Sequence, residues 1–197
     1  MGGIFFCRLQ FRKEVLYLHK NSKKMTNTAK KKREHTYTKA ERSKINKIKK
    51  VKITDKPSIP KSKNTESAQY RKKKIAEHMQ EIYGVHYCKE LNGDVAINQH
   101  ISNVETRFRA STGYKSTILA LNIENLLSSA VKIYDAPPKG NKQQKSFVRM
   151  HVLIAAVRGI GYAKITIGEY ENQIIAKAKY CHYCVTSISV HALKNKA

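Results

Sequence analysis

Residues 146–167 read SFVRMHVLIAAVRGIGYAKITI, and this stretch decides the fold. Its first part, 146–157, is rich in aliphatic and β-branched residues, which favour strands. The segment 162–167 alternates between two kinds of side chain, as a strand with one buried face does. Because the glycine-containing segment 158–161 between them is typical of a tight turn, the stretch predicts an antiparallel hairpin.

The flanking segments extend this hairpin into a sheet. Further strands are expected over 174–179 and 183–190, with a second turn at 168–172 between them and the hairpin. Upstream, Asn92-Gly93 tolerates positive φ, so it predicts a hairpin between strands at 85–90 and 95–98.

Two segments carry apolar residues at helical spacing. They are 68–83, which is followed by Gly84, and 117–130. The segment 101–110 is expected to be one more strand. The sequence therefore predicts an α+β fold, with an antiparallel sheet and two helices packed on one face.

The chain is expected to have three parts. In residues 1–24 a short apolar run precedes the cations, the reverse of a secretory signal, so this part is interpreted as an upstream leader before a true start at Met25. Residues 25–66 are rich in Lys, Ser, Thr and Asn with scattered apolar residues, which predicts a disordered arm. Residues 67–197 are expected to form the α+β domain.

Positive charge is concentrated toward the N-terminus. The formal net charge is +25, and residues 1–74 hold 24 of the 39 Lys and Arg but five of the 14 Asp and Glu. Clustered cations bind nucleic acid by releasing counterions, so RNA or DNA is the expected partner, and a solubilising tail is the alternative. The candidate phosphate-contacting residues are Lys30, Lys31, Lys32, Arg33, Lys49, Lys50, Lys52, Arg71, Lys72, Lys73 and Lys74.

Four cysteines are too few for a disulfide scaffold in 197 residues, so a cytoplasmic location is expected. Cys181 and Cys184, with His86 and Cys88, have the residue types of a zinc site. Both segments are expected to be strands, where residues three apart face opposite ways, so we predict core residues, no metal and no cofactor. The longest apolar run, 152–157, is far shorter than the roughly 18 residues of a membrane span, so no membrane is expected.

Four polar residues of the central hairpin are the candidate catalytic group. Arg149 and His151 are two apart and share a strand face, as do Lys164 and Thr166 on the next strand. On a common face, the imidazole could take the 2′-hydroxyl proton of RNA while the cations stabilise the phosphorane charge. The group predicts either a metal-independent ribonuclease or a solvated polar face without catalysis.

The segment Gly113-Tyr114-Lys115-Ser116 precedes the second predicted helix. Glycine, lysine and hydroxyl groups before a helix N-terminus can hold a phosphate, so Lys115 and Ser116 are candidate phosphate ligands near one edge of the sheet. The spacing is not that of a P-loop. The alternative is an ordinary loop in which Ser116 caps the helix.

The region of about 105–190 resembles the large polyvalent protein-associated domains of phages and conjugative elements. The resemblance rests on four segments in order: Gly113 to Ser116, Asn125 to Tyr134, Phe147 to His151, and the pattern Tyr162-x-Lys164-x-Thr166. It implies a fold related to the barnase–EndoU–colicin–RelE nucleases. The chain departs from the family at 176–179, where Ala-Lys-Ala-Lys replaces the usual tyrosine and acid.

These observations predict a nucleic-acid-associated accessory domain of a mobile genetic element, with a ribonuclease-like fold. A non-catalytic RNA- or ribosome-binding protein fits the same charge and size. A protein–protein adaptor, in which charge serves only solubility, is a third alternative. The first two differ at His151, because an enzyme needs this side chain at its substrate and a binding module does not.

Overall fold

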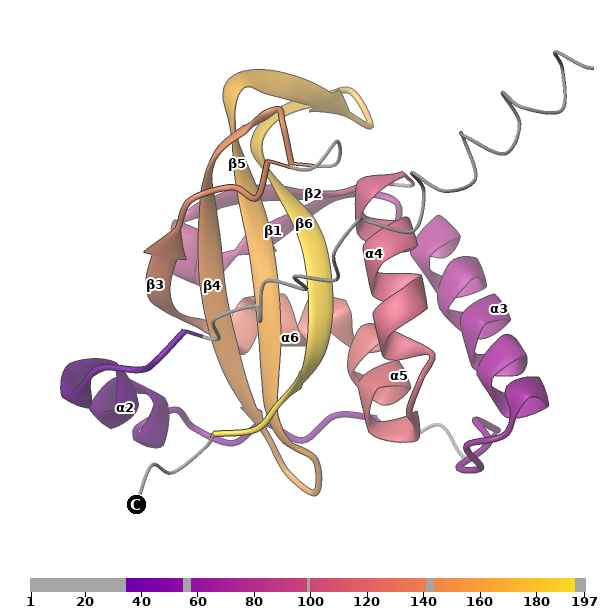
Figure 1. The fold of residues 1–197 in the computed structure, drawn as a ribbon. Coiled ribbons are helices and arrows are strands. Elements are labelled where there is room, and N and C mark those ends of the chain that lie inside the picture. Colours follow the sequence, from indigo (N-terminus) through magenta and orange to yellow (C-terminus); the bar gives the residue numbers. More distant parts are fainter. Residues whose placement is uncertain (1–34, 55–57, 99, 141–143, 194–197) are drawn as a thin grey trace, which may run out of the picture. The chain divides into compact units, whose positions relative to one another are not determined.

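Six strands form one sheet in the computed structural model, which describes residues 35–54, 58–98, 100–140 and 144–193 (Figure 1). The strands are β1 (Gly84–Cys88), β2 (Gly93–Ile97), β3 (Val131–Ala136), β4 (Phe147–Val157), β5 (Gly161–Ala176) and β6 (Lys179–His191). Their order is β1-β2-β6-β5-β4-β3, and every neighbouring pair is antiparallel except β2 and β6, which are parallel. The fold is therefore α+β, as predicted, but its sheet is mixed.

Five helices accompany the sheet in the described residues, where the sequence predicted two. They are α2 (Lys39–Asn46), α3 (Thr65–Glu81), α4 (Ile101–Ala110), α5 (Tyr114–Ala120) and α6 (Ile123–Ser129). Apolar residues of α5 and α6 share the main core with one face of β4, β5 and β6, α4 lies along β6, and α3 packs outside α4 and α5 (Figure 1). None of these described helices is long and apolar enough to cross a membrane.

The helix predicted over 117–130 is interrupted at Asn122. This buried side chain donates to the carbonyls of Ile118 (2.9 Å) and Thr54 (3.1 Å) and accepts from the Thr54 N–H (3.3 Å). Asparagine competes in this way with helical backbone bonds. The apolar stripe therefore continues across two short helices, α5 and α6, rather than one.

The prediction of a strand over 101–110 is wrong, because this segment forms the helix α4. Its buried face consists of small residues at helical spacing: Ser102, Thr106 and Ala110. The Ser102 hydroxyl donates to the Val185 carbonyl (2.5 Å), which ties α4 to β6. Two of these three buried residues are polar, so a search for apolar residues at helical spacing does not detect this helix.

The prediction of a second turn at 168–172 is also wrong, because β5 continues through these residues to Ala176. The chain reverses instead at Lys177 and Ala178, whose φ values of 46° and 62° suit a two-residue hairpin. The β5–β6 register is irregular between Glu169 and Ile174, so the polar run there marks a distortion within a strand. The hairpin around Asn92-Gly93 forms as predicted, but its first strand ends at Cys88 and Lys89–Leu91 form a 3-10 helix, η2. Of the Asn-Gly pair, Asn92 has positive φ, at 45°, while Gly93 already begins β2.

Much of the segment expected to be a disordered arm belongs to the folded unit. A capping box at Thr38 begins α2, and Ile45 is fully buried against Ile133 and Ile154. Further along, Val51 pairs with Val157 and Ile59 joins the main core. Each scattered apolar residue thus has its own partner in the sheet or core. The compact unit begins at Tyr37 rather than near 67, and the predictions for 1–34 lie outside the described residues.

Candidate functional site

A polar groove lies on the sheet face opposite the main core. On this face Lys164 of β5 pairs with Ser189 of β6, and Thr166 pairs with Ser187. The intervening Ile165 points to the other side, into the core. Cross-strand partners lie side by side, so alternation along two neighbouring strands places this ammonium and these hydroxyls in one patch.

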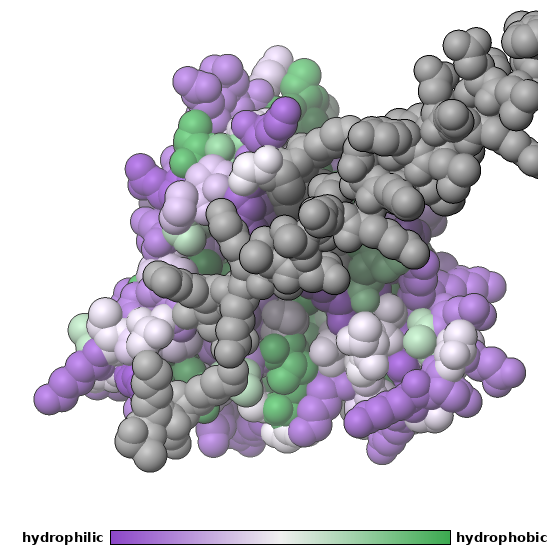
Figure 2. All heavy atoms as spheres, in the orientation of Figure 1, coloured by the Kyte–Doolittle hydropathy of each residue, from purple (hydrophilic) through white to green (hydrophobic). Residues whose placement is uncertain are grey.

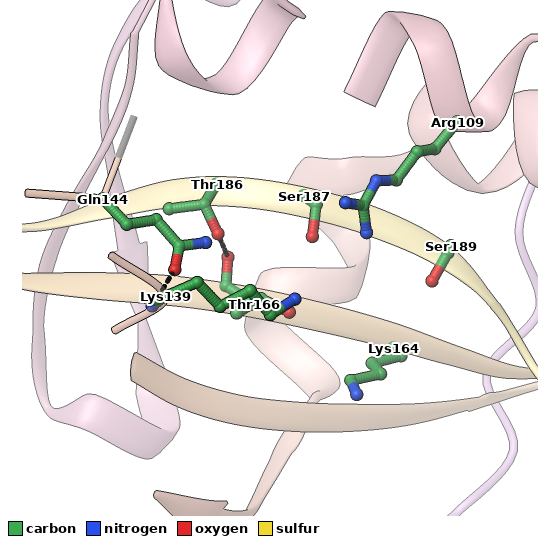
Figure 3. Close-up of a pocket in the computed structure, with 8 residues that line it drawn as sticks. All are labelled: Arg109, Lys139, Gln144, Lys164, Thr166, Thr186, Ser187 and Ser189. Carbon is green, nitrogen blue, oxygen red and sulfur yellow. Dashed lines mark hydrogen bonds between the residues drawn. The ribbon is translucent and has the colours of Figure 1, made fainter. Parts of the chain in front are cut away.

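Side chains from two other elements complete the groove (Figure 3). Arg109, at the end of α4, reaches toward Ser187 and Ser189 across β6. Lys139 and Gln144 come from the β3–β4 connection, where the Gln144 amide oxygen accepts from the Lys139 N–H (2.6 Å). The enclosed volume is about 130 Å³, and its lining residues are Arg109, Lys139, Gln144, Lys164, Thr166, Thr186, Ser187 and Ser189.

The groove is electropositive. Three of its lining residues are cations and none is a carboxylate. The Lys164 ammonium donates to the Tyr134 hydroxyl (3.2 Å). Burial, with a smaller effect of Glu41, raises the pKa of Tyr134, so this phenol stays neutral and does not offset the lysine charge. Charge and hydroxyl donors therefore converge on a space suited to an anion.

Apolar clusters border the groove along the same face. Toward β3, Ile154, the cross-strand partner of Lys164, packs with Ile45 of α2. Toward the β5–β6 hairpin, Phe147, Met150 and other residues form a second cluster. The polar patch is thus a bounded site between two packed regions.

The four candidate catalytic residues do not converge. Lys164 and Thr166 lie in the groove, but the cross-strand partner of Thr166 on β4 is Val152, whereas His151 pairs with Ile167 of the core face. His151 and Arg149 therefore lie on the opposite side of the sheet. The prediction correctly placed the pairs within each strand but wrongly assumed that both pairs share one face.

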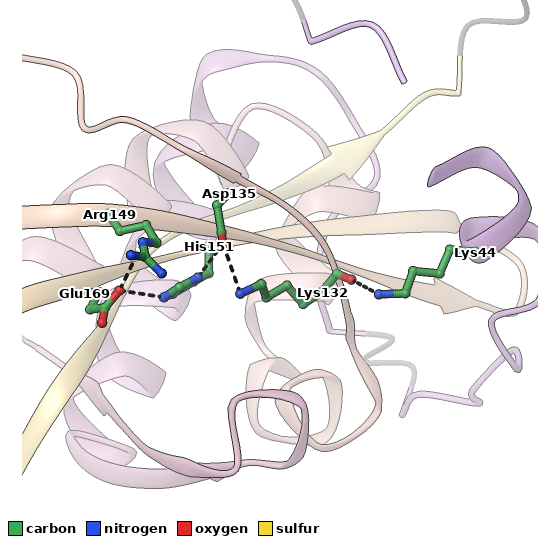
Figure 4. Close-up of polar contacts among 6 residues, drawn as sticks. All are labelled: Lys44, Lys132, Asp135, Arg149, His151 and Glu169. Carbon is green, nitrogen blue, oxygen red and sulfur yellow. Dashed lines mark hydrogen bonds and ion pairs between the residues drawn. The ribbon is translucent and has the colours of Figure 1, made fainter. Parts of the chain in front are cut away.

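His151 is 3% exposed and lies between two carboxylates (Figure 4). Its Nδ1 is 2.6 Å from Asp135 Oδ1, and its Nε2 is 3.2 Å from Glu169 Oε2. Arg149 approaches the same Glu169 oxygen at 3.6 Å. Burial alone would raise the pKa of Asp135, but hydrogen bonds from His151 and Lys132 outweigh it and hold that pKa below its ordinary value. This polar network joins β3, β4 and β5 around the buried His151 ring.

Arg71 is not a phosphate ligand, because its side chain is fully buried. The guanidinium donates to three backbone carbonyls, those of Ser111 (2.8 Å), Pro60 (3.0 Å) and Ser62 (2.6 Å). It thereby joins α3 to the end of α4 and to the chain before α3. A cluster of basic residues in the sequence gave no sign that one of its members has this role.

The other basic candidates lie at several places. Lys74 donates to Glu77 (2.7 Å), Lys73 is 3.9 Å from the same carboxylate, and Lys72 lies over the Phe108 ring. The exposed candidates before α3 are Lys49, Lys50 and Lys52. In Figure 2 hydrophilic side chains surround the visible face, over α2 and the β5–β6 hairpin as well as over α3. Lys30, Lys31, Lys32 and Arg33 lie outside the described residues.

Lys115 and Ser116 lie within the first turns of α5 and do not line the groove. The residue that precedes the helix is Gly113, which makes no side-chain cap, so the alternative of a Ser116 cap is wrong. Thr117 instead bonds back to the carbonyls of Ala110 (2.9 Å) and Gly113 (3.0 Å). These contacts fix the tight α4–α5 connection.

The three cysteines within the described residues, Cys88, Cys181 and Cys184, are core residues. Cys181 and Cys184 pack into one apolar cluster, although strand alternation predicted opposite faces, and Cys88 lies in the main core. Burial is the largest influence on Cys184 and raises its pKa to about 11, which keeps the thiol protonated. Within the described residues, no three His, Cys, Asp or Glu side chains are grouped to hold a metal ion.

Sequence reasoning missed most of the groove. Arg109 was assigned to a strand, and Lys139, Gln144, Thr186, Ser187 and Ser189 were not singled out. One signal was available: Ser187 and Ser189 flank Ile188 with the two-residue period of Lys164 and Thr166. Searches against family models, curated proteins and solved structures found no match to the chain. The resemblance to large polyvalent protein-associated domains therefore stays a prediction.

Proposed function

We propose that this protein binds the phosphate backbone of RNA or DNA in the groove and acts as a nucleic-acid-associated accessory protein without nuclease activity. The observation that carries the proposal is the composition of the groove: three cations and four hydroxyls, with no carboxylate. Ammonium, guanidinium and hydroxyl groups are the side chains that most often contact phosphate oxygens. An accessory role in a mobile genetic element agrees with the predicted resemblance and belongs to the same proposal.

The size of the groove favours a phosphate group over a whole small molecule. Pockets for drug-sized ligands enclose about 300–1,000 Å³. The groove encloses about 130 Å³, which suits one or two phosphate groups of a polymer that continues outside it. The net charge of +25 favours a polyanion over an isolated phosphate, because counterion release grows with the number of contacts.

The side chains of the groove favour binding over cleavage. Ribonuclease chemistry without a metal needs a group that takes the 2′-hydroxyl proton. None of the eight lining residues is a histidine or a carboxylate. The candidate base, His151, lies on the other face of the sheet and contacts Asp135 and Glu169 instead.

Fluorescence anisotropy of the full chain with labelled 12-nucleotide RNA and DNA tests this proposal. Arg109→Gln and Lys164→Gln should each weaken binding of every sequence and reduce the salt dependence, log Kd against log salt, by about one unit of slope. Lys115→Gln is the matched control, since this exposed lysine lies outside the groove. Unchanged slopes in the groove variants would overturn the proposal, as would cleavage of the RNA by the wild type that Lys164→Gln abolishes.

A further inference from the structure

The end of α4 carries an exposed aromatic ring one residue before the groove-lining Arg109. Phe108 is 56% exposed and directly precedes Arg109, whose guanidinium lines the groove. Successive residues of a helix point about 100° apart, so the two side chains leave the same turn in different directions. Their Cα atoms are neighbours in the chain, about 3.8 Å apart, so a strand several nucleotides long can reach both side chains.

Cations surround the Phe108 ring. The Lys72 ammonium lies 4.5 Å from the ring centroid, and the Arg107 guanidinium lies 5.8 Å from it. Among the described residues Lys72 forms no ion pair, whereas Lys74, beside the half-exposed Tyr70 ring, is bound by Glu77 at 2.7 Å. Of these two aromatic positions on α3 and α4, only Phe108 combines an exposed ring with a nearby lysine that is not held by a carboxylate.

Aromatic rings beside cations are the means by which proteins bind single strands. A base stacks on the ring, and the cation neutralises the phosphate of the same nucleotide. A duplex cannot offer this contact, because its bases are paired and stacked on one another. The ring would therefore add affinity for single strands on top of phosphate binding in the groove.

We propose that Phe108 is a stacking platform for a base of single-stranded nucleic acid, with Lys72 contacting the adjoining phosphate. This inference rests on the proposed function, because the groove supplies the phosphate contacts that bring the strand past Arg109. It adds a preference for single strands over duplexes. It also assigns that preference to one side chain.

Two probes separate stacking from phosphate binding in the full chain: a 12-nucleotide oligothymidylate, and a strand of equal length with abasic sugars in place of its bases. The wild type should bind the oligothymidylate about 10-fold more tightly than the abasic strand, which is the affinity that one stacked base typically contributes. Phe108→Ala should lower affinity for oligothymidylate to that for the abasic strand and leave abasic binding unchanged. Phe108→Trp should retain the preference.

Tyr180→Ala is the matched control, because Tyr180 is 65% exposed and its neighbour Lys179 is paired with Asp94. It should leave both affinities unchanged. Equal binding of the two strands by the wild type would overturn the stacking inference, as would a Phe108→Ala variant that keeps its preference for bases. If the abasic strand binds equally to wild type and to Arg109→Gln/Lys164→Gln, the groove proposal fails instead.

Discussion

Arg71 and Lys72 are neighbours in one basic cluster of the sequence, but their side chains lie in different environments. Arg71 is inside the protein and satisfies three carbonyls, while Lys72 lies at the surface over an aromatic ring. The sequence could predict that the cluster lies on a helix. It could not predict which cation is buried, because the carbonyls that Arg71 binds belong to residues 60, 62 and 111, which only the folded chain brings together.

Replacing Arg71 should therefore destabilise the protein. We expect Arg71→Met to lower the free energy of unfolding by about 3 kcal/mol, since it leaves the buried Ser111 carbonyl and two part-buried carbonyls without their charged donor. Lys73→Met, on the same helix with a 75% exposed side chain, should change it by less than about 0.5 kcal/mol. Urea denaturation measures both. If both substitutions change the free energy of unfolding by the same small amount, the hydrogen bonds of Arg71 do not stabilise the protein.

The carboxylate of Asp135 should make stability depend on pH in the acid range. Its pKa in the folded state lies below the ordinary value of 3.8, so the ionised form stabilises the fold above pH 3.8. This contribution is lost as the pH falls from 3.8 through the folded-state pKa. Asp135→Asn should therefore have a lower melting temperature than wild type at pH 6, and the difference should shrink below pH 4. A constant difference from pH 6 to 2.5 would contradict this origin.

Among the elements, the central hairpin was predictable and its surroundings less so. The aliphatic and β-branched residues of 146–157 and the alternation over 162–167 are enough to predict β4, the turn and the start of β5. The parallel pairing of β2 with β6 places Val95 beside Tyr183. These residues are far apart in the sequence, so no local pattern predicts the contact. The same holds for the face of each strand, because a single register shift moves every side chain to the other side.

The close packing of β4 on β5 can be tested at Gly168. A Cβ atom there would lie 2.5 Å from the Phe147 ring, which is itself buried against Tyr170. Gly168→Ala should destabilise the protein by about 1–3 kcal/mol through this overlap. Gly113→Ala, where a Cβ meets nothing within 4 Å, is the control. If Phe147→Leu does not recover part of the loss in the double variant, the overlap is not the cause.

The attachment of α2 can be tested at Ile45. This residue is fully buried, so Ile45→Ala should lower the free energy of unfolding by about 3 kcal/mol. Ile175→Ala, at a 66% exposed position, should have an effect near zero. If the two substitutions are equally harmless in thermal unfolding, α2 is not part of the cooperative unit, and the expected disordered arm would describe it after all.

For the whole molecule, the groove is assembled from distant parts of the chain. Arg109, Lys139, Lys164 and Ser189 come from α4, a connection and two strands, and none marks a local motif. The sequence predicts a basic protein with a nucleic-acid partner, and it singles out Lys164 and Thr166, although as catalytic residues beside His151. It could not predict that His151 lies across the sheet from them, because that depends on the β4–β5 register.

The most direct measurement is a titration of the isotope-labelled full chain with a 12-nucleotide oligothymidylate, followed by backbone amide chemical shifts. The groove account predicts the largest shifts at Arg109, Thr166, Ser187 and Ser189, with smaller shifts around Phe108. The amides next to His151 and Asp135 on the other face should shift little. Shifts confined to lysine-rich segments outside the groove, with Thr166, Ser187 and Ser189 unmoved, would contradict it.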